Sequence, residues 1–319
     1  MATDTEEARL ARRLDIPRLL VFIAVCEEGS ITGAARRLHL AQPAVTVAIA
    51  KLERLLDAHL LNRSLRGVTL TDSGKALLSR AYEITGLARA AVEEISGIAR
   101  VPAGEVTVGL PSSSAAVLAL PLIDRLSQRY PQIRLRLVDS FSGYLWQWLE
   151  VDELDVALVF DRSSTAFVEC VPMAQEDLHL VGRPELLSSS AGISLKKAAS
   201  FSLALASRKH GIRAALEDHF VRHGVPLTVA LDIDAGQHLV RLIKSSDWCS
   251  LLAPCAVAEE LARGELVARR LTPAFSRTVC LARRKASRGN SAVDVVIQEL
   301  RDLSRSLISE GVWAARWHG

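Results

Sequence analysis

A glutamine, a threonine and several arginines between residues 36 and 66 have side chains that can recognise nucleic acid. Gln42 can pair with the edge of an adenine, and Thr46 can reach a base or a phosphate. Arg63 and Arg66 flank a turn that ends in Gly67, where arginines can contact phosphates or enter the minor groove. The full set of candidate DNA contacts is Arg36, Gln42, Pro43, Thr46, Val47, Ala50, Lys51, Arg54, Arg63 and Arg66.

These side chains need three short helices and a two-stranded wing to position them. Apolar residues recur at helical spacing from Leu19 to Cys26, and Ser30 is a good N-cap for a second helix. A third helix is expected over residues 42–55, and the wing over residues 61–70. The residues of the third helix that should face the core are Val45, Ile49, Leu52 and Leu56. This pattern predicts a winged helix-turn-helix, whose third helix enters the major groove.

The charge of this segment agrees with a nucleic-acid partner, although the net charge of the whole chain is only +3. Between Ser30 and Lys75 there are seven cations against three anions, so the rest of the chain is close to neutral. The alternative is that these cations form an ordinary solvated surface, and this alternative is strongest for Lys51 and Lys75.

The stretch from residue 19 to 75 resembles the N-terminal domain of LysR-type transcriptional regulators, and the resemblance continues more loosely to about residue 300. The matching residues are Ala34, Ala35, Leu38, Gln42, Pro43, Ala44, Ile49, Leu52, Glu53, Leu61, Arg63, Arg66, Leu70, Thr71 and Gly74. Ala41 departs from the family, because many relatives have a serine there that would cap the helix. Val47 and Ala48 stand where many relatives have arginine or glutamine, so we expect sparse base readout and a larger share of phosphate contacts and DNA shape.

The segment after the wing predicts a dimer. From residue 72 to about 100, apolar or small residues recur in alternating steps of four and three, which is the seam of a coiled coil. The expected contact residues are Leu77, Ala81, Ile84, Ala88, Ala91 and Ile95. The alternative is a helix that packs on its own domain. A homodimer or homotetramer suits a DNA-binding protein, because paired recognition helices read two half-sites. Gly97 and residues 101–104 are a natural hinge.

From Glu105 onward, short apolar strands alternate with helices, which predicts an α/β sheet. The resemblance implies two Rossmann-like lobes similar to a periplasmic binding protein, with the chain crossing between them twice. The expected parts are a mobile extension (1–14), the DNA-binding domain (15–71), the linker helix and hinge (72–103), an effector-binding domain (104–304) and a C-terminal tail (305–319). Within the effector domain, we expect lobe one at 105–173 with 278–304, and lobe two at 174–277.

Two hydroxyl-rich helix starts are the candidate ligand site. Ser112 and Ser113 follow the first strand of the α/β region, and Ser142 and Gly143 follow the second. Ligands of open α/β sheets bind beyond the carboxyl ends of strands, and helix N-termini favour anions. The alternative for each serine is that it only caps its helix. Phe160 is a further candidate, at the end of a strand.

In lobe two, the resemblance of residues 207–213 to a family segment adds His210 and Arg213, whose charge would complement an anion. Either residue could equally be structural. The sequence Ser142-Gly143-Tyr144-Leu145, with Trp148 and Leu149, resembles the nitrogen-assimilation-control branch of the family.

Several classes of function are not supported by the sequence. We find no GxGxxG, Walker, GxSxG or HExxH motif, and no cysteine spacing typical of a metal site, so we expect no enzyme activity and no cofactor. No apolar run is long enough for a membrane span, and the five cysteines indicate reduced thiols in a cytoplasmic protein, with a redox-sensor role for one of them left open. The expected function is therefore regulation of transcription through double-stranded DNA and a small, anionic organic effector. The alternative is a metabolic enzyme or ligand-binding protein with an appended DNA-binding domain.

Overall fold

The computed structural model describes residues 14–64, 67–95, 101–187 and 192–318. The chain divides into two compact units. The first contains residues 1–100 with 165–167 and 285–290, and the second contains the remainder. The expected mobile extension lies almost wholly outside the described residues, as does Gly97 of the expected hinge.

The first unit begins with three helices, α2 (Ile16–Glu28), α3 (Ile31–Arg37) and α4 (Gln42–Leu56). Asp15 caps α2 by accepting a hydrogen bond of 2.9 Å from the amide of Arg18. Gly29 ends α2 with a φ of 56°, a left-handed conformation that favours glycine. Ser30 then caps α3 as predicted, accepting from the amide of Gly33.

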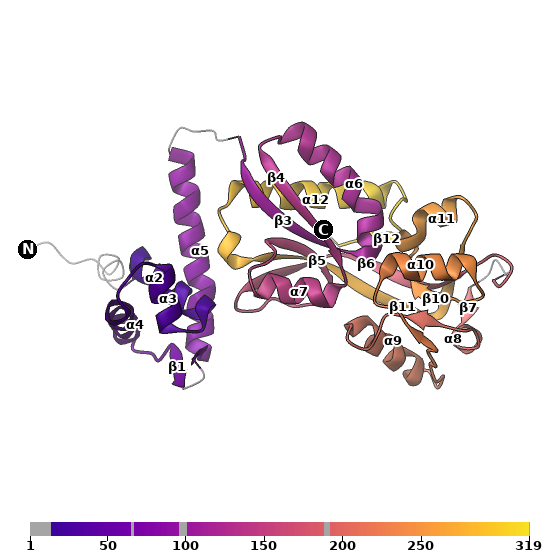
Figure 1. Ribbon diagram of the computed structural model, residues 1–319, viewed down its shortest axis with the longest axis horizontal. Helices are drawn as coiled ribbons and strands as arrows, with labels where there is room; N and C mark the ends of the chain where they lie inside the picture. Colours follow the sequence, from indigo (N-terminus) through magenta and orange to yellow (C-terminus); the bar gives the residue numbers. More distant parts are fainter. Residues whose placement is uncertain (1–13, 65–66, 96–100, 188–191, 319) are drawn as a thin grey trace, which may run out of the picture. The chain divides into compact units, whose positions relative to one another are not determined.

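The three helices enclose a small core, which the next helix completes. Val45, Ile49 and Leu52 of α4 are buried as expected, but the prediction for Leu56 is wrong, since its side chain is 37% exposed. Leu56 is the last residue of α4, where the helix ends at Asp57. Antiparallel strands β1 (Leu61–Ser64) and β2 (Gly67–Leu70) form the wing, and α5 (Asp72–Ile95) follows (Figure 1).

The second unit is built on one mixed sheet with the strand order β10-β6-β11-β5-β3-β4. Its strands are β3 (Gly104–Pro111), β4 (Ile133–Ser140), β5 (Val156–Phe160), β6 (Val168–Gly182), β10 (Ser250–Leu252) and β11 (Val267–Arg284). Short β7 (Ile193–Ser194) pairs with β11, and β8 (Ala204–Leu205) pairs with β9 (Leu231–Asp232) in a separate two-stranded sheet. The parallel pairs β3–β4 and β3–β5 place the ends of these strands at one edge, as the α/β pattern requires.

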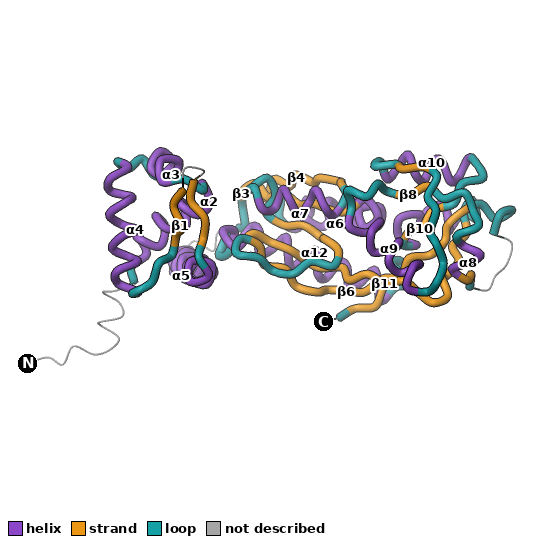
Figure 2. The backbone as a smooth tube through the Cα atoms, turned by 90° about the horizontal axis from the view of Figure 1, so that it is seen from below, coloured by secondary structure: helices purple, strands orange, loops and turns teal. Residues whose placement is uncertain are grey.

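Helices flank these strands, as the tube drawing shows (Figure 2). The helices of this unit are α6 (Ser112–Arg129), α7 (Ser142–Glu150), α8 (Leu195–Ala198), α9 (Gly211–Arg222), α10 (Gly236–Ser245), α11 (Ala258–Ala262) and α12 (Ser291–Ser309), with a 3-10 helix η1 (Pro254–Val257). Helices α6 and α12 pack against each other and on β3, and α7 packs on β3 and β5. Among the described residues, every helix is too short or too polar to cross a bilayer.

Strands β6 and β11 are much longer than the sequence pattern predicts. Apolar runs predict strands only over 178–182 and 278–282, whereas the observed strands begin at Val168 and Val267 and pair with each other over most of their length. The additional segments contain Pro172 and Pro273 and several charged residues, which disfavour strands locally. Their pairing is a long-range property, because the two strands lie about a hundred residues apart in sequence. The expected crossings between lobes, near residues 173 and 277, fall inside these two continuous strands.

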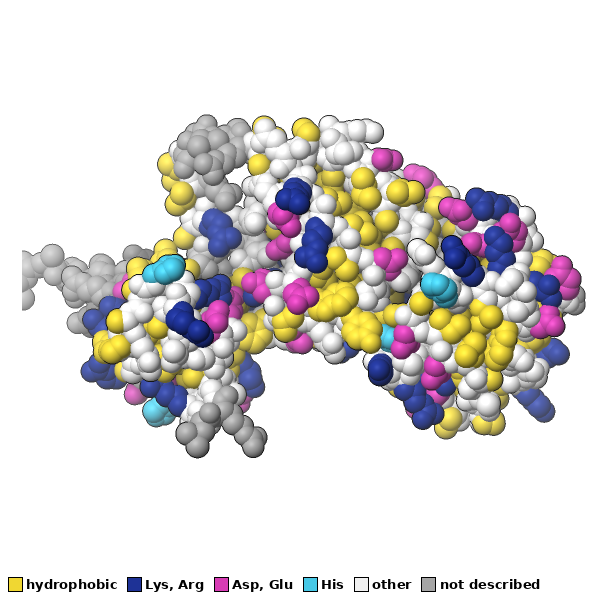
Figure 3. Space-filling view, in the orientation of Figure 1, with side chains coloured by type: hydrophobic (Ala, Val, Ile, Leu, Met, Phe, Trp, Pro, Cys, Tyr) yellow, Lys and Arg dark blue, Asp and Glu magenta, His cyan; other side chains and the backbone are white. Residues whose placement is uncertain are grey.

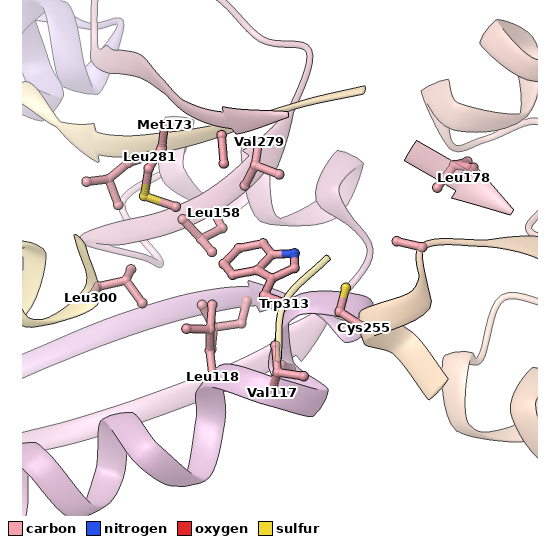
Figure 4. Packing of buried hydrophobic residues seen from close by; sticks show 14 of the residues in the cluster. Val117, Leu118, Leu158, Met173, Leu178, Cys255, Val279, Leu281, Leu300 and Trp313 are labelled. Atoms are coloured by element: carbon pink, nitrogen blue, oxygen red, sulfur yellow. The ribbon is translucent and has the colours of Figure 1, made fainter. Parts of the chain in front are cut away.

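The C-terminal segment is part of the core and not only a tail. Helix α12 continues to Ser309, and β12 (Ala315–Trp317) pairs with β6. Between them, Trp313 is 1% exposed, and its ring lies among apolar side chains of lobe one, including Leu118 and Leu158 (Figure 4). Its indole Nε1 donates a hydrogen bond of 2.8 Å to Oε2 of Glu176. The indole therefore packs within the apolar core and also donates a hydrogen bond to the buried carboxylate of Glu176.

Replacement of Trp313 tests this double role. We expect Trp313→Ala to lower the free energy of unfolding by about 3–5 kcal/mol, because it leaves a large cavity. Trp313→Phe keeps most of the ring but removes one donor to Glu176, and we expect it to cost about 1–3 kcal/mol. Urea unfolding followed by circular dichroism measures both values. The exposed neighbour Val312 provides the control, since Val312→Ala should change little. Equal, small effects of all three changes would contradict a core role for the C-terminal segment.

Candidate functional site

The first candidate site is the exposed face of α4. Gln42, Pro43, Lys51 and Arg54 are exposed on it, and Val47 is 60% exposed although its side chain is apolar. Thr46 and Ala50 are half-buried between them. All seven predicted contact residues of α4 therefore keep at least part of their surface accessible. Ala41 supplies no side-chain cap, so the amides at the start of α4 remain without that partner.

Two polar side chains of this face make bonds along the helix. The hydroxyl of Thr46 donates to the backbone oxygen of Gln42 at 3.2 Å, and Nε of Arg54 donates to that of Ala50 at 3.3 Å. These bonds turn each side chain along the helix without burying it. Val47, which has no polar group, offers only an apolar contact at the centre of the face, such as a thymine methyl would match.

The cations around α4 differ in what they already contact. Arg36 and Arg63 are exposed, whereas Arg37 forms an ion pair of 2.7 Å with Glu27. Arg66 of the wing lies outside the described residues, so the predicted arginine pair is described only at Arg63. Figure 3 shows Lys and Arg side chains on the visible face of this unit, some of them beside acidic side chains. Exposed cations and an exposed helix start in one unit are what phosphate contact requires.

The apolar seam of α5 divides into two parts. Ala81 is fully buried in the core of its own unit, and Leu77 and Ile84 pack partly against that core. The second half is different, because Leu87, Val92 and Ile95 are 73%, 66% and 84% exposed. Ala88 is half-buried and Ala91 is exposed. The first half therefore follows the alternative of packing on its own domain, and the second half presents an apolar stripe to solvent.

In the second unit, the two helix starts carry their serines where the sequence predicts. Neither α6 nor α7 has a side-chain cap hydrogen bond, so the serines do not serve as caps. The hydroxyl of Ser112 donates instead to Asp139 at the end of β4. The Ser142 hydroxyl accepts a hydrogen bond of 2.9 Å from the backbone amide of Phe160, which ties the start of α7 to the end of β5.

Lobe two meets these helix starts through His210 and Gly236. The imidazole of His210 stacks on Phe141 with ring centroids 4.2 Å apart and meets the edge of Tyr144 at 5.2 Å. A Cβ atom added to Gly143 would lie 3.8 Å from Nδ1 of His210, and one added to Gly236 would lie 2.8 Å from Cβ of Ser112. Glycine at position 236 thus permits the close approach of lobe two to α6, whereas a Cβ at position 143 would make only an ordinary van der Waals contact.

The His210 ring is 3% exposed, and its polar atoms are incompletely satisfied. Nε2 lies 3.3 Å from a carboxylate oxygen of Asp234, which is ion-pair distance if the ring is protonated. Neither ring nitrogen has a hydrogen-bond partner among the described residues, because proximity to Asp234 alone does not make a hydrogen bond. Both ring nitrogens therefore keep hydrogen-bonding capacity that no described residue uses.

Arg213 is brought near this region but has other partners. Its guanidinium contacts Glu217 at 2.7 Å and Asp232 at 3.0 Å, and it donates to the backbone oxygen of Ala206. These contacts tie α9 to β9 and to the segment after β8. The geometry therefore favours the structural alternative for Arg213.

Sequence reasoning missed Arg277, which stands between two of the predicted residues. Its Nη2 donates 2.9 Å to the hydroxyl of Ser113, and its guanidinium carbon lies 3.5 Å from the centre of the Phe160 ring. The side chain is 7% exposed and forms a buried ion pair of 2.6 Å with Glu176. The sequence did contain a signal for Arg277. Phe275, Arg277 and Val279 are spaced two residues apart, and in a strand such residues lie on the same face.

Comparisons with known proteins agree with this arrangement. Residues 16–75 match the family model described as bacterial regulatory helix-turn-helix protein, lysR family, and residues 99–305 match the LysR substrate binding domain. The nitrogen assimilation regulatory protein nac of Klebsiella aerogenes is 29% identical over 299 residues, which cover 93% of this chain and 96% of that protein. The expected similarity to the nitrogen-assimilation branch is confirmed.

Two solved structures share the fold. Full-length LysG from Corynebacterium glutamicum with bound effector Arg is 16% identical, with a TM-score of 0.64 over 92% of this chain and 99% of that one. Full-length CbnR in complex with its target DNA is 22% identical, with a TM-score of 0.52 over 91% of this chain and 100% of that one. The nac relative is named as a regulator and not as an enzyme. From the two family models, which together span most of its length, the chain belongs to the LysR family of transcriptional regulators.

Proposed function

We propose that this regulator binds operator DNA as a dimer or a pair of dimers, and that a small anionic organic molecule between lobes one and two modulates it. The effector proposal is carried by two uncapped helix starts that meet lobe two: the start of α7 lies against His210, and the start of α6 lies against Gly236. Amides at helix starts carry partial positive charge, so they attract an anion.

For the DNA end, support comes from the exposed face of α4 and from Arg63 on the wing. A fold neighbour, CbnR, has been solved with its target DNA. Because Val47 and Ala50 have no polar groups, Gln42 and Thr46 are the base-reading candidates of α4. We infer that phosphates and DNA shape supply much of the affinity.

For the dimer, support comes from the exposed stripe on the second half of α5. Leu87, Ala91 and Ile95 are four residues apart, so they lie along one side of the helix. A soluble chain gains from covering such a stripe, and a second copy of α5 has the matching surface. Pairing would hold two recognition helices at a fixed spacing.

For the effector, the sides of the cleft are complementary to a carboxylate with a small apolar body. The hydroxyls and amides at Ser113 and Ser142 and the imidazole of His210 supply polar contacts, and Phe141 and Phe160 supply apolar ones. The fold neighbour LysG was solved with bound arginine, which carries a carboxylate of its own. Binding that favours one arrangement of the lobes would reach the DNA end as a coupling free energy, typically about 1–3 kcal/mol.

The DNA proposal predicts different effects for two substitutions. Arg63→Ala should weaken binding to all sequences and reduce the salt dependence of log K by about one unit, because one phosphate contact is lost. Gln42→Ala should relax base preference more than total affinity. Both are measured by gel shift, over a salt series, with an operator selected from a random DNA pool. Arg222→Ala, on the exposed side of α9, is the matched control. An unchanged salt slope for Arg63→Ala would remove the wing strand from the interface.

The dimer proposal predicts that Leu87→Asp dissociates the protein. The side chain is 73% exposed, so the substitution spares the core of its own unit, whereas Ile84→Asp would disturb it. A charge in a paired stripe would be buried without a partner, and both self-association and operator affinity should fall together. Analytical ultracentrifugation measures the first and gel shift the second. Val221→Asp, at a 64% exposed site on α9, is the control. An intact dimer in Leu87→Asp would place the main interface elsewhere.

The effector proposal predicts that Ser142→Ala or Ser113→Ala raises the effector concentration needed for a response by about tenfold. Loss of a hydrogen bond to a charged group costs about 1.5–3 kcal/mol, and to a neutral group about 0.5–1.5 kcal/mol. A thermal-shift screen of the full-length protein against organic acids and their neutral amides would first identify a ligand. Titration of operator complexes then gives the response, while DNA binding without effector should be unchanged. Wild-type sensitivity in the double variant, or stabilisation by the amides alone, would contradict the proposed anion site.

A further inference from the structure

Two of the five cysteines lie side by side on the strands that connect the lobes. Cys170 on β6 is opposite Ala282, and Cys280 on β11 is opposite Pro172. The two cysteines are therefore diagonal neighbours on adjacent antiparallel strands, and their side chains point to the same face of the sheet. Both are free thiols, 8% and 1% exposed.

The same backbone oxygen lies near both sulfur atoms. The backbone oxygen of Arg162 lies 3.4 Å from Sγ of Cys170 and 3.7 Å from Sγ of Cys280. Arg162 belongs to the exposed loop 161–164 that follows β5. Ser164 of the same loop accepts a hydrogen bond of 2.9 Å from the amide of Cys170 and donates one to its carbonyl oxygen. Only a short surface loop thus separates the thiol pair from solvent.

The thiols also act on each other. Each thiol is the largest influence on the other: the neighbouring Cys170 lowers the pKa of Cys280 to about 7 from the ordinary 9.0, and Cys280 raises the pKa of Cys170. A thiolate that is stabilised by a neighbouring thiol is the reactive form of cysteine. For the other three cysteines, burial is the main influence on the pKa. It raises the pKa of Cys26 to about 12 and that of Cys249 to about 11, and it also raises the pKa of Cys255.

We propose that Cys170 and Cys280 are a redox-active pair that a small hydroperoxide converts to a reversible disulfide. The Cys280 thiolate attacks the terminal oxygen of the peroxide, the O–O bond breaks, and the alkoxide or hydroxide that leaves takes up a proton. This gives a sulfenic acid on Cys280 and an alcohol or water. The Cys170 thiol then attacks that sulfur, the S–O bond breaks, and water leaves with the thiol proton. The two sulfurs together lose two electrons, which the peroxide accepts.

Formation of the disulfide requires a local movement of the backbone. Diagonal Cα atoms on paired strands lie about 7–8 Å apart, slightly beyond the usual range of about 4.4–6.8 Å for a disulfide. The strands must therefore approach a little. The pairing of β11 with β6 shifts register between Val279 and Cys280, and the ladder is locally irregular at such a shift. The bond would lie next to the loop that follows Phe160.

Thiol mapping of the full-length protein tests the proposal without operator or effector, so its outcome is independent of the proposed function. The reduced protein is treated with hydrogen peroxide, alkylated under denaturing conditions, digested and analysed by mass spectrometry. We expect two thiols to escape alkylation, a linked peptide pair that contains Cys170 and Cys280, and recovery of both thiols after dithiothreitol. Five alkylated thiols after peroxide, or linkage through other cysteines, would overturn the proposal.

Single variants separate the two roles. In Cys170→Ser, peroxide should leave a sulfenic acid on Cys280 that dimedone labels, because the resolving thiol is absent. In Cys280→Ser, Cys170 should remain alkylatable. Cys249→Ser is the matched control and should still form the linked pair. Circular dichroism confirms folding, and Cys170→Ala replaces Cys170→Ser if the latter does not fold. Dimedone labelling at Cys26, Cys249 or Cys255 in place of Cys280 would contradict the assignment of the reactive thiol.

Discussion

The arrangement of strands and helices in the second unit depends on the buried ion pair between Glu176 and Arg277. Glu176 is 1% exposed, and Arg277 binds one of its oxygens through both Nε and Nη2 at 2.7 and 2.6 Å. Two charges in a protein interior are stable only when their remaining polar atoms are also satisfied. Here Trp313 and Cys255 donate to the other carboxylate oxygen, and Arg277 donates in addition to Ser113. Breaking such a pair on one side typically costs about 3–5 kcal/mol.

This network gathers parts of the chain that are distant in sequence. Glu176 and Arg277 lie on β6 and β11, the strands that pass from one lobe to the other. Ser113 opens α6 at the candidate ligand site, and Trp313 anchors the C-terminal segment. The packing of Arg277 on Phe160 extends the network to the end of β5. One set of polar contacts thus holds the two crossing strands, the start of α6 and the C-terminal segment in a common arrangement.

In the DNA-binding unit, local helix caps and apolar packing hold the elements together. Its helices are short, their caps are local, and its core is a continuous apolar cluster from Leu19 to Tyr82. The contact face of α4 needs no buried polar network, because its side chains point to solvent. The same unit uses the first half of α5 to complete its core, which leaves the second half of that helix with an apolar stripe exposed. The first half of α5 thus packs within its own unit, and the second half leaves apolar side chains exposed.

The sequence by itself determined the order and type of most elements and the family. Helix caps and apolar runs act over only a few residues, so they can be predicted from the sequence. Examples are the caps Asp15 and Ser30 and the apolar run of β3. The sequence also singled out Ser113, Ser142 and His210, and the fold links their segments through Arg277, Phe160 and Phe141. Only the tertiary structure decided that β6 and β11 extend through charged and proline-containing segments, and that Ala81 lies in the core of its own unit. It also decided that Arg277 is buried beside Ser113 and Phe160, and that Arg213 is held by Glu217 and Asp232. The reason is that the burial and contacts of a charged or small residue depend on partners that can lie a hundred or more residues away. A local sequence pattern carries no information about such partners.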